Sequence, residues 1–275
     1  MKREIIIKFI SILVAAIAIY FAYKFSLWLG IAVTAAVIIY AIYAIMPALY
    51  EIQANKAYQA GDFNKSRDWY KKAVDTNRAK INTKTSYAYI LMRTGDIDLA
   101  ETVLNGIIRT KGVKPAEKNY AKQQRCMVYF KQGKLDEAIE EANEIFDDGN
   151  YKNTTLYGML GYFKYLTEPV EDALKFCLEA YEYNSDDRDI TDNLSLCYYK
   201  KGDYEKAKEL SDKIISQNPQ FVEAYYHGAQ IAVKCGEYEK AKEYLEKIPD
   251  CRWSNMTTVT HEEVEKLIEE VNEKL

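Results

Sequence analysis

The side chains best suited to metal chemistry or nucleophilic catalysis are few and scattered. The chain of 275 residues has only 2 His and 5 Cys. The cysteines are Cys126, Cys177, Cys197, Cys235 and Cys251. None of them forms a CxxC pair, and zinc sites draw their ligands from such short spacings. We therefore expect no metal and no cofactor, and we interpret the thiols as small helix residues in a reducing compartment.

Enzyme motifs are also absent from the sequence. The glycines are isolated, so there is no phosphate-binding loop, and neither GxSxG nor HExxH occurs. His227 and His261 fall in helical patterns and are interpreted as structural or solvated rather than catalytic. The acidic runs 136–144 and 262–270 alternate with apolar residues at helical spacing, which is typical of solvated helix faces. The sequence therefore predicts a binding protein that is not an enzyme.

Glycine turns recur along the chain. They are centred on Gly61, Gly95, Gly133, Gly202 and Gly236, with spacings of 34, 38, 69 and 34 residues. The interval of 69 is two periods plus one, and a turn at Thr167-Glu168-Pro169 divides it. A small residue follows each turn, namely Ser66, Ala100, Ala138, Ala173, Ala207 and Ala241. Small side chains let two helices approach closely, so the pattern predicts repeated helical hairpins.

These residues resemble the tetratricopeptide repeat, a helix-turn-helix unit of about 34 residues with the pattern W-x2-L-G-x2-Y…A-x3-F…P. Tyr157, Leu160 and Gly161 match its opening, whereas Tyr198, Gly202, Tyr204, Ala207 and Pro219 match its later positions. Two departures are the weak match of the first two repeats and the closing proline, which is present only as Pro219. The resemblance implies an all-α fold, an α-solenoid of about six helix pairs over residues 47–255. The repeats are expected near 47–80, 81–114, 119–152, 154–187, 188–221 and 222–255.

The end of the chain predicts one further helix. Residues 260–275 carry an apolar stripe at helical spacing, and Thr260 with Glu263 predicts a capping box at its start. Because terminal repeats need a polar-faced cap, we expect a capping helix here.

The first helix of each repeat is expected to line a concave groove that binds a protein or peptide. Aromatic anchors with a row of basic side chains would suit an extended or helical peptide bearing carboxylates. The alternative is that Tyr-Lys before the turn glycine is common throughout the family and therefore says nothing about a ligand. The candidate groove residues are Tyr58, Tyr89, Met92, Arg93, Met127, Phe130, Lys131, Tyr162, Tyr165, Leu196, Tyr199, Lys200, Tyr226, Gln230 and Lys234. The Lys and Asn clamp of chaperone-tail binders is not formed.

Residues 1–46 have the composition of a membrane anchor. Residues 5–23 contain Lys8 as their only charge, and residues 27–46 contain none. About 20 apolar residues cross the hydrocarbon core as a helix, so two transmembrane helices are expected, at about 5–23 and 27–46. Pro47 is expected to end or kink the second helix. A cleaved signal peptide followed by one span is the alternative, although no small-residue cleavage site precedes Lys24.

Charge sets the expected topology and partners. Lys2, Arg3 and Lys8 favour a cytoplasmic N-terminus, and two crossings would return the repeats to the cytoplasm of a bacterial cell. Residues 51–275 carry a net charge of −7 without a basic face, which argues against nucleic acid. We expect a membrane-anchored scaffold for protein–protein interaction. The alternatives are an assembly subunit of a membrane complex or oligomer, and a repeat protein outside the cytoplasm.

Overall fold

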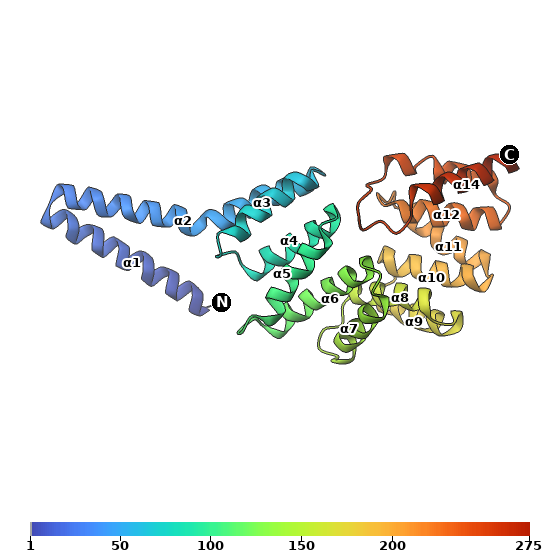
Figure 1. The fold of residues 1–275 in the computed structure, drawn as a ribbon, viewed down its shortest axis with the longest axis horizontal. Coiled ribbons are helices and arrows are strands. Elements are labelled where there is room, and N and C mark those ends of the chain that lie inside the picture. Colours follow the sequence, from blue (N-terminus) through green and yellow to red (C-terminus); the bar gives the residue numbers. More distant parts are fainter. Residues whose placement is uncertain (1) are drawn as a thin grey trace. The chain divides into compact units, whose positions relative to one another are not determined.

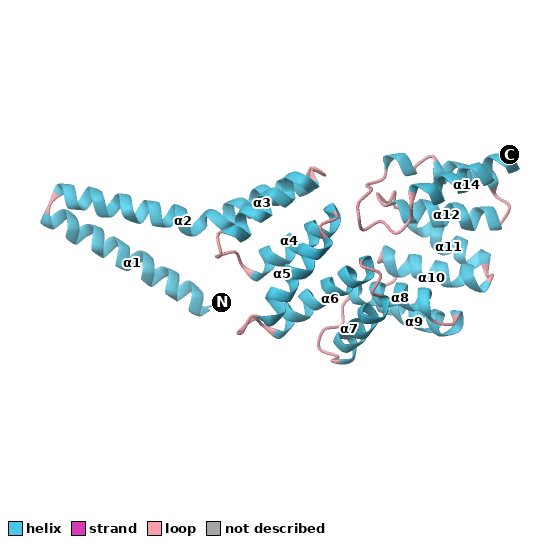
Figure 2. Ribbon diagram, viewed as in Figure 1, coloured by secondary structure: helices cyan, strands magenta, loops and turns pink. Residues whose placement is uncertain are grey.

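The computed structural model describes residues 2–275 and, within them, the side chains from residue 9 onward. The chain divides into two compact units, Met1–Thr83 and Lys84–Leu275. Helices joined by short loops make up the described residues, and no strand occurs among them (Figure 2). The expected all-α fold is confirmed.

The first unit is built on a long helix (Figure 1). Helix α1 (Lys2–Phe25) turns at Ser26 into α2 (Leu27–Gln59), which pairs with α3 (Phe63–Asp75). Tyr50 of α2 stacks on Trp69 of α3 at 5.7 Å between ring centroids, and Ala54, Ala57 and Tyr70 are buried between the two helices. Residues 27–46 of α2 are largely exposed.

Helix α2 continues through Pro47, so of the two expected effects of this proline, a helix end or a kink, the helix end does not occur. Proline has no N–H, and its ring frees the carbonyl of the residue four positions earlier. That residue is Tyr43, whose carbonyl accepts a hydrogen bond from Nη1 of Arg78. The Arg78 guanidinium also lies 3.3 Å from the centroid of the Tyr43 ring. A partner from outside the helix therefore compensates for the missing hydrogen bond.

Most apolar side chains of α1 from residue 9 onward, and of the first half of α2, are exposed. Trp28 is 78% exposed and Ile39 is 67% exposed. Among the described residues, α2 is the one helix long and apolar enough to cross a membrane, with a hydropathy of 2.3, whereas Phe9–Phe25 is a shorter apolar helix. The helices pack closely at their turn, where a Cβ on Gly30 would lie 2.3 Å from the Tyr23 ring.

The second unit is a series of helical hairpins. Its helices are α4 (Ile81–Thr94, from Lys84), α5 (Ile97–Arg109), α6 (Pro115–Lys131), α7 (Leu135–Asp147), α8 (Thr154–Thr167), α9 (Val170–Tyr183), α10 (Arg188–Lys201), α11 (Tyr204–Ile215), α12 (Val222–Lys234), α13 (Tyr238–Leu245) and α14 (His261–Lys274). A short 3-10 helix, η1 (Ile248–Asp250), follows α13. From α5 onward, successive helices pack against each other, and α14 packs on α13 and α12.

Local sequence explains the hairpins. Gly202 and Gly236 adopt φ angles of 88° and 76°, a left-handed conformation that glycine reaches without steric cost. The small residue after each turn is fully buried, as expected for close helix approach. Helix α14 begins with the predicted capping box: the Thr260 hydroxyl accepts from Glu263 N, and the Glu263 carboxylate accepts from Thr260 N at 2.7 Å.

Gly228 of α12 is expected to accept a side chain only at a cost in stability. A Cβ there would lie 2.5 Å from Ile215 Cδ1 and 2.9 Å from Ser211 Oγ of α11. Gly228→Ala should lower the free energy of unfolding by about 1–3 kcal/mol, the usual cost of overpacking. The matched control is Gly106→Ala in α5, where a Cβ meets nothing within 4 Å, and it should stabilise by about 0.5–1 kcal/mol. Thermal unfolding followed by circular dichroism measures both. Equal effects of the two substitutions would contradict the packing argument.

Candidate functional site

The candidate site is the surface formed by the first helices of successive hairpins, α4, α6, α8, α10 and α12, which we call the inner face. Of the fifteen predicted groove residues, fourteen belong to these helices. Tyr58 belongs to the first unit, where its ring packs against Phe63 at 5.5 Å.

Three predicted aromatic residues form a continuous strip on the inner face. Phe130 of α6 lies edge-on to Tyr162 of α8, with 5.8 Å between ring centroids, and Tyr162 stacks on Tyr165 at 6.3 Å. Lys200 of α10 extends the strip, because its Nζ lies 5.2 Å from the Tyr165 ring centroid and donates to the Tyr165 carbonyl at 3.0 Å. All three rings are half-buried. Burial raises the pKa of Tyr165 to about 12, so its hydroxyl stays neutral at physiological pH.

The other predicted groove residues differ in accessibility. Met92 and Leu196 are only 1% and 4% exposed, so their side chains offer little surface to a partner. Gln230 donates to the Tyr226 hydroxyl at 3.0 Å, and Arg93 donates to the Tyr89 hydroxyl at 3.1 Å. The remaining members are half-buried or exposed: Met127 and Tyr199 are half-buried, and Lys234 is exposed.

A loop of the same chain lies against the inner face. It comprises residues 252–260, between η1 and α14, and we call it the finger (Figure 1). At its tip, Asn255 N donates to the Arg93 carbonyl at 3.2 Å and Asn255 Nδ2 donates to the Met92 carbonyl at 3.3 Å, both on α4. Lys131 Nζ of α6 donates to the Thr257 carbonyl at 3.2 Å. Three predicted groove residues are thus already engaged by the finger.

The finger is anchored at its base on α12 and α14. Arg252 N donates to the Gln220 carbonyl at 2.9 Å, and Thr258 N donates to Glu223 Oε1 of α12 at 2.8 Å. The Trp253 ring stacks on His261 of α14 with 3.7 Å between centroids, and Val259 is buried beside α12 and α14. A turn between Ser254 and Thr257, closed by a 3.0 Å backbone hydrogen bond, presents Asn255 at the tip.

Carboxylates surround the part of the inner face nearest to α12. His227 of α12 is buried and pairs with Asp192 of α10, with 2.8 Å between Nδ1 and Oδ2. Burial lowers the pKa of His227, but the charge and hydrogen bond of Asp192, assisted by Glu223 and Glu263, raise it above its ordinary value. The sequence interpretation of His227 as structural agrees with this packing. Burial also lowers the pKa of Lys131, against the opposing charge of Glu223.

The pair of His227 and Asp192 makes stability depend on pH. Because the folded pKa of His227 lies above its ordinary value of 6.5, the contribution is complete below 6.5 and is lost as pH rises through the folded pKa. Asp192→Asn should therefore lower the free energy of unfolding by about 1–3 kcal/mol near pH 6 and by less near pH 8. Thermal unfolding at the two pH values measures this difference. Exposed Asp186→Asn is the control, and an equal loss at both pH values for Asp192→Asn would contradict the assignment.

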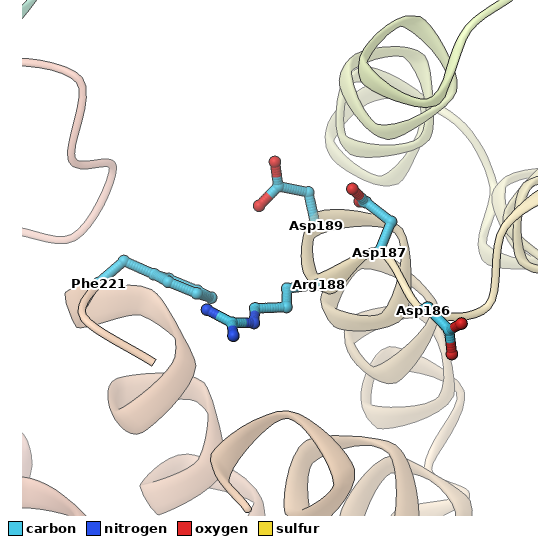
Figure 3. Close-up of a pocket in the computed structure, with 5 residues that line it drawn as sticks. All are labelled: Asp186, Asp187, Arg188, Asp189 and Phe221. Carbon is cyan, nitrogen blue, oxygen red and sulfur yellow. The ribbon is translucent and has the colours of Figure 1, made fainter. Parts of the chain in front are cut away.

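A cavity of about 350 Å3 lies beside the N-terminal end of α10, and the sequence did not indicate it. Asp186, Asp187, Arg188, Asp189 and Phe221 line the cavity (Figure 3). The Arg188 and Phe221 side chains point toward one another, whereas Asp187 and Asp189 point away from Arg188 (Figure 3). Arg188 Nε donates to Gln217 Oε1 at 3.0 Å, so its guanidinium is held by the loop after α11.

The fold and the repeated glycine turns define an α-solenoid of tetratricopeptide-repeat type. Residues 198–252 match the family described as the tetratricopeptide repeat. The chain therefore contains tetratricopeptide repeats, and the resemblance inferred from its residues is confirmed. No curated protein matches the chain in sequence.

Solved structures share this fold at low sequence identity. A tetratricopeptide repeat protein from Parabacteroides merdae ATCC 43184 is 15% identical, with a TM-score of 0.55 over 82% of this chain and 86% of that chain. The structure titled as the functional characterization of Pseudomonas aeruginosa pilF is 13% identical, with a TM-score of 0.57 over 83% and 99%. PilW, described as a widely conserved type IV pilus biogenesis factor, is 12% identical, with a TM-score of 0.58 over 81% and 98%. These similarities show the fold alone.

Proposed function

We propose that the chain is a membrane-anchored scaffold that binds a protein partner on the inner face of its helix array, with the array in the cytoplasm. The observation that carries the proposal is the strip of Phe130, Tyr162 and Tyr165. Its rings come from two successive inner helices and remain half-buried rather than fully packed. Aromatic residues in such positions are the usual anchors of protein interfaces.

The charge of the inner face indicates which side chains the partner should present to it. Lys131 and Lys200 each donate to a backbone carbonyl, and Asp192, Glu223 and Glu263 lie near Tyr162 or His227. The positive charge expected from the sequence is therefore balanced by carboxylates. The aromatic strip, rather than a basic row, supports partner binding, and apolar side chains of the partner should provide most of the contact.

The exposed apolar surface of α2 supports the membrane anchor. This helix has the length and hydropathy to cross a bilayer, and the apolar side chains of its residues 27–46 are largely exposed. Tyr43 and Arg78 meet near the end of the apolar stretch, where aromatic and basic side chains favour the interface between lipid and water. We propose two crossings, by α1 and α2, because residues 5–23 carry only one charge.

Crosslinking from the inner face tests partner binding. A photoreactive amino acid in place of Tyr226, in full-length protein within cells, should capture a specific partner. Tyr162→Ala together with Tyr165→Ala should abolish the capture, because both aromatic anchors are lost. Tyr162→Phe with Tyr165→Phe keeps the rings and should retain it, and exposed Tyr183→Ala of α9 is a control on another helix. Capture that persists in the double alanine variant, with the helices still folded, would remove the strip from partner binding.

Protease accessibility tests the topology. A C-terminal tag should resist protease added outside intact cells and become sensitive after the membrane is permeabilised. Cleavage in intact cells would place the helix array outside the cytoplasm.

The second candidate function is a subunit that assembles with another copy or with a membrane complex through residues 1–46. The largely uncovered apolar side chains of α1 and α2 favour it, because helices in a bilayer often pack against others. Measuring the mass of residues 47–275 in solution separates the two functions. A monomeric fragment beside an oligomeric full-length chain would assign assembly to the first 46 residues.

A further inference from the structure

The finger occupies the surface that a partner would need. Its contacts join residues far apart in the sequence: Asn255 reaches Met92 across 163 positions, and Lys131 reaches Thr257 across 126. In addition, the Thr258 hydroxyl and backbone N–H both point to the Glu223 carboxylate, at 3.2 Å and 2.8 Å. The finger thus spans from the C-terminal end of α4, past α6, to the N-terminal end of α12.

The finger differs between its base and its tip. Val259 at the base is buried among Val222, Tyr225 and Val264, and this apolar contact fixes the end of the finger that leads into α14. The tip is held by three hydrogen bonds, two from Asn255 to carbonyls of α4 and one from Lys131 to the Thr257 carbonyl, and Asn255 remains exposed. Hydrogen bonds to an exposed loop contribute little net stability, because water replaces them when the loop leaves. The tip can therefore detach while the base stays in place.

We propose that the finger closes the inner face, and that its tip must withdraw before a partner can reach Lys131 and the ends of α4 and α6. This inference rests on the proposed function of the inner face. In the closed state, the Lys131 ammonium donates a hydrogen bond to the Thr257 carbonyl. The carbonyls of Met92 and Arg93 accept hydrogen bonds from Asn255. Partner binding and finger docking are then mutually exclusive at these groups.

The reactivity of Lys131 measures closure without a known partner. Full-length protein in detergent is treated with a limiting amount of a water-soluble acylating reagent at pH about 8, and mass spectrometry gives the modification of Lys131 relative to exposed Lys234. In the test variant, residues 254–258 are replaced by Gly-Ser-Gly-Ser-Gly at unchanged length. Asn272→Ala, at the far end of α14, is the control.

The ratio of Lys131 to Lys234 modification should rise about fivefold in the test variant, the factor that corresponds to losing roughly one net hydrogen bond. Releasing the finger should also let the pKa of Lys131 return upward, which would slow the reaction. A faster reaction therefore reports access. An unchanged or lower ratio would overturn the proposal.

Hydrogen exchange of residues 252–260 in the unaltered protein provides a second measurement. The amides of Asn255 and Thr258 are hydrogen-bonded, so they should exchange several-fold more slowly than a free loop. Exchange at the rate of an unstructured peptide would also overturn the proposal. Because no partner enters either measurement, failure here is separate from failure of the crosslinking experiment.

Discussion

Replacing Arg125 by alanine is expected to lower the free energy of unfolding of the second unit by about 3–5 kcal/mol, because it leaves a buried carboxylate without its cation. Arg125 of α6 makes two hydrogen bonds to Glu141 of α7, with 2.9 Å between Nε and Oε2. Its Nη1 also donates to Asn105 of α5. The Glu141 side chain is only 8% exposed, so solvent cannot replace the guanidinium. Urea unfolding of the full-length protein followed by circular dichroism measures the loss.

Two further variants separate charge from packing. Lys122→Ala removes another ion pair between α6 and α7, but the Glu144 partner is 66% exposed, so the cost should be at most about 1 kcal/mol. Arg125→Met combined with Glu141→Leu removes both charges at similar volume and should recover most of the stability. A double variant as unstable as Arg125→Ala would show that the unpaired carboxylate is not the cause, because the double variant has no carboxylate at position 141.

Removing residues 1–46 is expected to transfer the protein from the membrane fraction to the soluble fraction. Apolar residues at the centre of a spanning helix each favour insertion by roughly 0.3–0.6 kcal/mol, and residues 27–46 contain no charge to oppose it. Full-length protein should stay with the membrane after an alkaline carbonate wash. Fractionation followed by immunoblotting measures the distribution of both forms.

A second truncation distinguishes one span from two. A chain without residues 1–25 keeps all of α2, which is long enough to cross a bilayer, so it should remain membrane-bound. Its C-terminal tag should then move to the opposite side of the membrane if the full-length chain crosses twice. Membrane association of residues 47–275 would contradict the assignment of the anchor to the first 46 residues.

The helical hairpins could be predicted because their causes are local and periodic. A glycine that takes a positive φ, such as Gly202, and a small residue five positions later, such as Ala207, are visible without tertiary information. The capping box of Thr260 and Glu263 is likewise confined to one helical turn. Each of these features depends only on residues that are close together in the sequence, so local patterns reveal them.

The finger and the contacts of Arg78 with Tyr43 and of Arg125 with Asn105 could not be predicted because they join distant, non-repeating positions. Residues 254–258 have no helical or strand pattern, and nothing near Asn255 points to the carbonyls of α4. Arg78 compensates for Pro47 from 31 positions further along the sequence, so a local pattern cannot show that the helix continues through this proline. The burial of Met92 and Leu196 was missed for a related reason, since register alone does not show which side chains the neighbouring helices cover.

The continuity of α2 has a mechanical consequence. A flexible linker would let a tethered array sample all orientations above a membrane, whereas one rigid helix of 33 residues carries residues 47–59 in a fixed direction from residues 27–46. With the proposed anchor inserted, tilting or rotating this helix in the bilayer would turn the hairpin of α2 and α3 by the same angle. The uninterrupted helix would thus transmit any change in its tilt to the hairpin of α2 and α3. Bilayer thickness or lateral pressure would then set the orientation of that hairpin relative to the membrane.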